Sequence, residues 1–174
     1  MTSFPERMIG AAKLNVEIYE EVEADGTATR QAMGVVLLSS VAAGIGALSL
    51  GTGVIASAVA ALLSWVIWAF LTSFVGTRLF PEPQTEADMG QLMRTLGFAQ
   101  SVGVLRVFGG VPVLGSLLLG VVSVWMLVAM VVAVRQALDY TSTWRAAAVC
   151  IVAWLAVIIP AALLLGLFGT PADG

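Results

Sequence analysis

A polar stretch from Val134 to Val149, VRQALDYTSTWRAAAV, separates two long apolar runs. It contains two arginines, an aspartate and two large aromatic residues. Arginine, tyrosine and tryptophan are enriched where proteins bind one another. We therefore regard five of its residues as candidates for a partner-binding surface. They are Arg135, Asp139, Tyr140, Trp144 and Arg145.

The same stretch also has a purely structural interpretation, which stays open. Either Ser142 or Thr143 is expected to cap the start of the fifth helix, because serine and threonine are favoured at that position. Arg135 and Asp139 stand four residues apart and can pair on a helix. Tyrosine and tryptophan anchor helix ends at membrane surfaces.

Arg106 is the other residue whose chemistry stands out, because it lies within an apolar run. A charged side chain at the bilayer centre costs about 2.5–3.5 kcal/mol on insertion scales, so it marks a functional site by default. On an α-helix Arg106 shares a face with Ala99, Gly103 and Gly110, and small residues favour packing against protein. The alternative is that its side chain extends to lipid phosphates near the end of the helix.

The sequence offers no catalytic constellation. It has no histidine, no Gly-x-Ser-x-Gly motif, no cysteine cluster and no phosphate-binding glycine loop. We therefore expect no enzymatic activity, no cofactor and no metal site. Because the basic residues form no patch, we also expect no binding of nucleic acid.

Composition assigns the chain to the integral membrane proteins. Of its 174 residues, 59% are hydrophobic and only 11% are charged, and the mean hydropathy is +0.98. A soluble domain of this size cannot bury so many apolar side chains.

Runs of roughly 20 apolar residues, the length that crosses a bilayer, predict an all-α fold with five transmembrane helices. They are expected at about 34–50, 54–75, 95–111, 113–134 and 146–168, as one membrane domain over 33–174. The third is short and begins with an amphipathic stretch, in a helix running from about 86 to 108. Thr85 and Asp88 resemble a capping arrangement at its start.

Charge distribution fixes the expected orientation, because lysine and arginine concentrate in short cytoplasmic loops. With five spans and a cytoplasmic N-terminus, all of the eight basic residues except Arg106 fall on the cytoplasmic side. The C-terminus is then external. With four spans, Arg135 and Arg145 would be exported, so the charges favour five.

The segment 1–32 is expected to be a cytoplasmic, weakly amphipathic segment with one helix from Pro5 to about Val22. Its acidic residues oppose tight attachment to anionic lipid. Docking on the protein's own cytoplasmic loops or on a partner is the expected alternative.

Three segments resemble the Yip-one family of Ypt/Rab-interacting-protein domain membrane proteins, bacterial type. They are AAKLNVEIYEEVEADGTATRQA, RTLGFAQSVGVLRVFGGVPVLG and VWMLVAMVVAVRQALDYTSTWRA. The resemblance implies five spans, a cytoplasmic N-terminus and residence in a bacterial plasma (inner) membrane. Eukaryotic relatives bind Rab GTPases and act in vesicle traffic. This chain departs from them in having only 33 residues before its first expected span, where they carry a longer cytoplasmic region.

The expected function is non-enzymatic binding of protein or lipid, as a scaffold, an assembly factor or a membrane-organising protein. An accessory subunit of a larger membrane complex is the first alternative, and a small-solute channel or transporter is the second. The expected partners are membrane lipid and other membrane or cytoplasmic proteins, and self-association stays open.

Overall fold

The computed structural model describes residues 2–47, 53–85, 88–112 and 114–168, and every regular element among them is helical. Among the described residues, four helices are long and apolar enough to cross a membrane, whereas five spans were expected from the sequence. They are α3 (Ala28–Gly46), α4 (Val54–Arg78), α6 (Leu114–Ala137) and α7 (Thr143–Phe168). Most of their ends differ by a few residues from the expected spans, because polar caps and turns, not hydropathy, decide where a helix starts and stops.

The N-terminal segment forms two helices, α1 (Phe4–Ala12) and α2 (Val16–Ala24), where the sequence analysis expected one. The break lies at Leu14, whose φ is +62°, and at Asn15, whose side chain accepts a hydrogen bond from the backbone N–H of Glu17. Asparagine caps helix starts well. The single-helix expectation was wrong because Asn15 begins a new helix within an amphipathic pattern.

The third expected span consists of two parts, α5 (Met89–Ala99) and the 3₁₀ helix η2 (Gln100–Gly110). Asp88 is the N-cap and forms a capping box with Gln91. The expected pairing of Thr85 with Asp88 was therefore wrong, and the Thr85 hydroxyl instead accepts a hydrogen bond from the backbone N–H of Glu82. Runs of 3₁₀ helix beyond three or four residues are uncommon, so η2 indicates a tight local constraint.

Glycines allow α5 and η2 to run parallel to α3 at close distance, because the contacts advance in the same direction along both segments. A methyl group on Gly97 would lie 2.7 Å from the Ala32 side chain, and one on Gly103 would lie 2.0 Å from the Ser39 hydroxyl. At the far end, a methyl group on Gly46 would lie 2.0 Å from the backbone oxygen of Arg106. The backbones therefore touch along their whole shared length.

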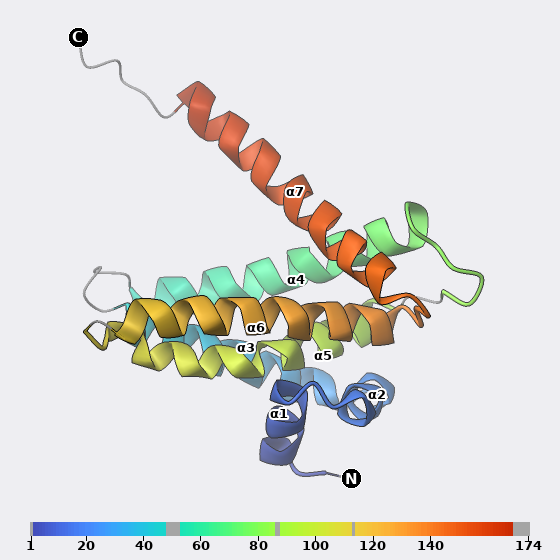
Figure 1. Ribbon diagram of the computed structural model, residues 1–174, viewed down its shortest axis with the longest axis horizontal. Coiled ribbons are helices and arrows are strands. Elements are labelled where there is room, and N and C mark those ends of the chain that lie inside the picture. Colours follow the sequence, from blue (N-terminus) through green and yellow to red (C-terminus); the bar gives the residue numbers. More distant parts are fainter. Residues whose placement is uncertain (1, 48–52, 86–87, 113, 169–174) are drawn as a thin grey trace.

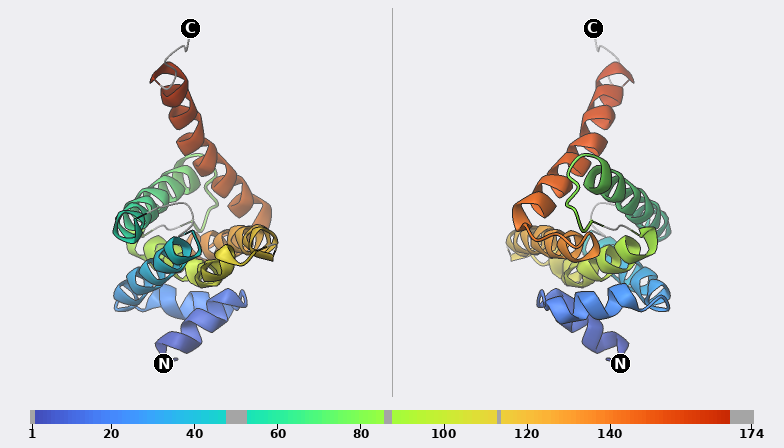
Figure 2. Two further views of the ribbon diagram at one scale, coloured as in Figure 1. Left: turned by 90° about the vertical axis from the view of Figure 1, so that its left-hand side faces the viewer. Right: turned by 90° about the vertical axis from the view of Figure 1, so that its right-hand side faces the viewer.

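Helices α3, α5, η2 and α6 form the centre of the bundle, and α4 packs along α3 and α5 (Figure 1). Helix α7 packs on α4 and α6 only near its start and then diverges from them (Figures 1 and 2). Ala146, Val149 and Ala153 are buried there, whereas Trp154 and Leu163 farther along are exposed. The pair α1 and α2 lies on the side of the bundle opposite to α7 (Figure 2).

Candidate interaction surface at the junction of α6 and α7

Residues 138–142 join α6 to α7 in a turn whose shape depends on Asp139. Its φ of +52° is in the left-handed region, which aspartate tolerates better than most residues. Ser142 occupies the N-cap position of α7, and its backbone oxygen accepts from the N–H groups of Arg145 and Ala146.

Tyr140 attaches this turn to the end of α4. Its side chain is buried, and its single hydroxyl proton is shared between the backbone oxygens of Gly76 and Phe80, each 2.9 Å from the phenol oxygen. Burial raises the pKa of the Tyr140 phenol to about 12, so it remains a donor at neutral pH. Gly76 permits the approach, since a methyl group there would lie 2.4 Å from the Leu138 side chain.

Glu82, in the loop after α4, is the centre of the junction's polar contacts. One of its carboxylate oxygens accepts from the Thr141 backbone N–H at 3.0 Å and from the Thr141 hydroxyl at 2.8 Å. The other lies 3.4 Å from Nε of Arg145. The Thr141 N–H, followed by the hydroxyl, holds the pKa of Glu82 below its ordinary value. The carboxylate is therefore ionised and keeps the turn in register at neutral pH.

Two further contacts join the loop after α4 to the junction. Nη1 of Arg145 donates to the Pro81 backbone oxygen at 3.0 Å, and the Gln84 amide donates to the Asp139 backbone oxygen at 3.1 Å. Sequence reasoning did not identify Glu82. Its one local signal is an acidic residue placed between two prolines, Pro81 and Pro83.

The five candidate residues thus differ in their environments. Tyr140 and Arg145 bind the loop after α4. Nε of Arg135 donates to the Tyr140 backbone oxygen at 3.2 Å, instead of forming the expected pair with Asp139. The Asp139 carboxylate and the Trp144 indole are exposed, and Trp144 is 86% accessible. The junction is rigid beneath and presents one large aromatic residue outward.

A second polar cluster fastens α1 to α2 and α3. The Arg7 guanidinium is 2% exposed and lies 2.8 Å from carboxylate oxygens of both Glu21 and Asp25. It also donates to the Gln31 side chain. The pKa of Glu21 is lowered to about 2, first by the Thr2 hydroxyl and then by Arg7. The cluster is therefore charged over the physiological pH range.

Arg94 fastens α2 to α5. Its guanidinium donates to the backbone oxygens of Val22 and Glu23 near the end of α2, where helix carbonyls lack intrahelical partners. Burial raises the pKa of the adjacent Glu23 carboxyl to about 7, and the negative charge of Asp139 adds to the shift. Sequence reasoning missed both Arg94 and Glu23, because no local pattern indicates a contact with a segment some 70 residues away.

Arg106 is half-buried in η2, and within the described residues it forms no ion pair and no side-chain hydrogen bond. In a 3₁₀ helix residues three apart lie on one face. Arg106 therefore shares its face with Gly103 and Gly109, whereas the sequence analysis expected Ala99, Gly103 and Gly110. The described residues hold no group of three metal-ligating side chains.

Comparison with known proteins gives one family. The family model described as the Yip1 domain matches residues 18–164, which include the whole junction and most of the described helices. No curated protein and no solved structure gives a significant match.

Proposed function

Because the chain belongs to the Yip1 domain family, we propose that this multi-pass membrane protein acts by binding a partner protein at its cytoplasmic face. The observation that carries the proposal is the junction of α6 and α7, where a rigid turn presents an exposed tryptophan. The role is non-enzymatic, and the family is not known for catalysis. The location is a bacterial plasma membrane.

The orientation on which this rests has five spans, with α5 and η2 together as the third. A 3₁₀ helix rises about 2.0 Å per residue and an α-helix about 1.5 Å. The 11 residues of α5 and the 11 of η2 therefore extend about 38 Å, and the 24 residues of α6 extend about 36 Å. The 3₁₀ geometry supports a crossing by a segment that is otherwise short.

The exposed apolar residues support an inclined bilayer, whose normal points between two directions, that of the bundle axis and that of α7. On α4, exposed apolar side chains run from Ile55 to Phe74, but on α6 they run only from Leu114 to Val128. Such an inclination leaves α1 and α2, on the side opposite to α7, in the cytoplasm (Figure 1). It also accounts for the divergence of α7, where the apolar side chains of Leu155, Val157, Ile158, Ile159 and Leu163 are exposed.

A reporter that is active only in the cytoplasm, fused after Gly174, tests the orientation. We expect no activity there, because the C-terminus is external with five spans. The same reporter fused before Thr2 is the matched control and should be active. Strong activity at the C-terminal position would refute the five-span arrangement.

The partner surface consists of the Trp144 indole and the Asp139 carboxylate. Both are exposed, and neither takes part in the hydrogen bonds that hold the junction together. An exposed tryptophan on a rigid support loses little conformational entropy on binding, which is why such residues dominate binding energies. Arg135 and Tyr140 support this surface from beneath, and Arg145, which is itself exposed, binds the loop after α4. The competing role for Trp144 is that of a lipid anchor at the headgroups.

Site-specific photocrosslinking in intact membranes separates the two roles. We expect a photoreactive phenylalanine analogue at position 144 to give a discrete protein adduct, and the same analogue at the lipid-facing Trp154 to give none. The adduct from position 144 should weaken when Asp139 is changed to Asn, which keeps the left-handed backbone. Adducts with lipid alone at position 144 would refute partner binding.

An accessory-subunit role is the second candidate, and the exposed apolar side chains between Trp154 and Leu163 of α7 favour it. Such a face packs against another membrane helix in a larger complex. Copurification in mild detergent distinguishes the two. A fixed stoichiometric set of membrane partners indicates a subunit, whereas a single substoichiometric cytoplasmic partner indicates the junction surface.

A further inference from the structure

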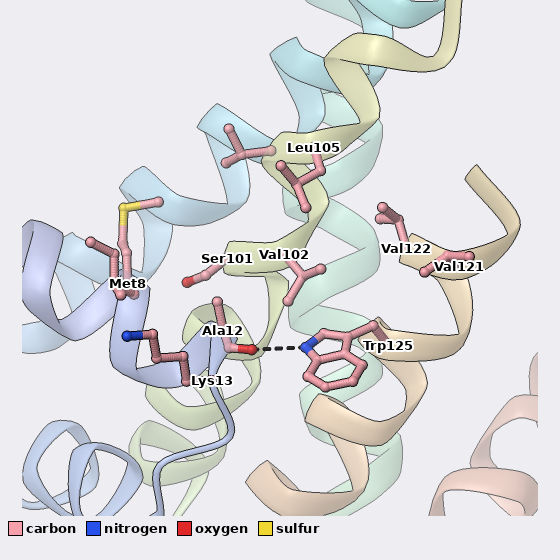
Figure 3. Close-up of a pocket in the computed structure, with 11 residues that line it drawn as sticks. Met8, Ala12, Lys13, Ser101, Val102, Leu105, Val121, Val122 and Trp125 are labelled. Atoms are coloured by element: carbon pink, nitrogen blue, oxygen red, sulfur yellow. Dashed lines mark hydrogen bonds between the residues drawn. The ribbon is translucent and has the colours of Figure 1, made fainter. Parts of the chain in front are cut away.

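A groove of about 510 Å³ lies between α1, η2 and α6, away from the α6–α7 junction (Figure 3). Its walls are almost wholly apolar and include Met8, Val102, Leu105, Val121 and Val122. The volume is within the range of small-molecule sites, about 300–1,000 Å³. Leu105 and Val121 are also exposed at its rim, so the groove is continuous with the lipid-facing surface.

Trp125 holds the groove open by fixing the end of α1. Its indole N–H donates to the backbone oxygen of Ala12 at 2.8 Å, as the dashed line in Figure 3 marks. That oxygen is one of the last in α1 and needs a partner from outside the helix. The bond sets α1 at a distance from η2 and α6 that leaves space between them.

Lys13 is the one charged residue in the lining, at the end of α1 (Figure 3). It is exposed, and it forms no ion pair with any residue that the structure describes. The other polar side chain in the lining, Ser101, already donates its hydroxyl proton to the Phe98 backbone oxygen at 2.7 Å. The groove therefore combines apolar walls with one available positive charge.

These features match a lipid with an anionic headgroup. An apolar wall open to the bilayer accommodates an acyl chain, and an ammonium group at its end attracts phosphate by about 1 kcal/mol near a membrane surface. The inclined bilayer places Lys13 near the cytoplasmic headgroups, since the exposed apolar residues of α6 end at Val128, next to Trp125.

We propose that this groove binds one anionic phospholipid of the cytoplasmic leaflet, with an acyl chain along η2 and α6 and its phosphate at Lys13. The proposed orientation is needed only for the choice of leaflet. The site does not depend on the partner surface at the junction, so either proposal can fail without the other.

Native mass spectrometry of the full chain, released from membranes of phosphatidylglycerol and phosphatidylcholine, tests the site. We expect one bound phosphatidylglycerol per chain, preferred about fivefold over phosphatidylcholine, as one lysine's attraction implies. Lys13→Gln should remove the preference while some lipid remains bound. Arg30→Gln changes the net charge equally at another exposed cytoplasmic position and should leave the preference unchanged.

Val121→Phe tests the acyl-chain part, since a larger side chain at the rim fills the groove. Bound lipid of either kind should then be lost, while Ile67→Phe on the exposed face of α4 should retain it. Equal binding of the two lipids by the unaltered chain would overturn the proposal. So would equal losses from Lys13→Gln and Arg30→Gln, lipid retained by Val121→Phe, or displacement of the lipid by inorganic phosphate.

Discussion

Gly46 is a position where a single added methyl group should strongly lower the stability of the bundle. In Gly46→Ala the new carbon would lie 2.0 Å from the Arg106 backbone oxygen, whereas ordinary contacts begin near 3.4 Å. That neighbour is backbone and cannot rotate away, so α3 and η2 would have to separate by about 1.4 Å. A gap of that size forfeits more than half of the dispersion energy of each contact it opens.

We expect Gly46→Ala to destabilise the protein by about 3 kcal/mol, the upper part of the range for overpacking. For a chain of this length that corresponds to a fall in Tm of roughly 6–12 °C. Thermal unfolding in a mild detergent, followed by circular dichroism, measures the change. Gly120→Ala on α6 is the matched control, because a methyl group there meets nothing within 4 Å, and it should be neutral or slightly stabilising.

Gly103→Ala tests whether backbone clashes cost more than side-chain clashes. Its added methyl group would meet the Ser39 hydroxyl, which is the end of a side chain. The substitution should cost less than Gly46→Ala, and a second change of Ser39 to Ala should recover part of the loss. Equal Tm values for Gly46→Ala and Gly120→Ala would refute the close backbone contact between α3 and η2.

Three further predictions concern charged residues. The pKa of Glu23 is raised to about 7 from an ordinary 4.5, so the folded state favours the protonated carboxyl. The contribution of Glu23 to the free energy of unfolding is therefore greatest below about pH 4.5 and is lost as pH rises through 7. Glu23→Gln should therefore be more stable than the unaltered chain by roughly 1–3 kcal/mol at pH 8 and about equally stable at pH 4.5. A Tm difference that is the same at both pH values would contradict this. Arg7→Met should lower Tm by roughly 4–8 °C at pH 7, because it removes the positive charge that pairs with the Glu21 and Asp25 carboxylates. The loss should shrink as pH falls through 4.5 toward 2, and a loss independent of pH would count against the ion pairs. Arg106→Leu should change Tm little or raise it slightly, since the guanidinium has no partner among the described residues, and a large fall in Tm would reveal a buried one.

The sequence was sufficient to predict the all-helical fold and its apolar helices, because a run of some 20 apolar residues has few alternatives to a helix in a membrane. It did not predict η2. The 3₁₀ geometry depends on how closely Gly103 approaches Ser39 on another helix, and the local pattern of η2 is compatible with an α-helix. The break at Asn15 was visible as a capping residue, but amphipathic periodicity continued through it.

The position of the polar turn between two long helices was predictable from the sequence, but the arrangement of its side chains was not. Aromatic and charged residues at positions 135–145 identified the junction, and hydropathy identified its flanking helices. Which side chains face outward depends on Glu82, which stands 59 residues before Thr141 in the chain. Contacts at that separation leave no periodicity for sequence reasoning to find, so Tyr140 and Arg145 could not be separated from Trp144 in advance.

The contact between Glu82 and Thr141 also has a consequence for the order of events during biosynthesis. Closing a loop of 59 residues costs on the order of 4 kcal/mol in chain entropy, which the contact recovers only when α6 is already in place. The loop after α4 therefore stays without this contact while α5, η2 and α6 are synthesised. Its attachment to the turn before α7 is then a late assembly step. A chain that stops before that turn would leave the Glu82 carboxylate without its bonds to Thr141 and Arg145.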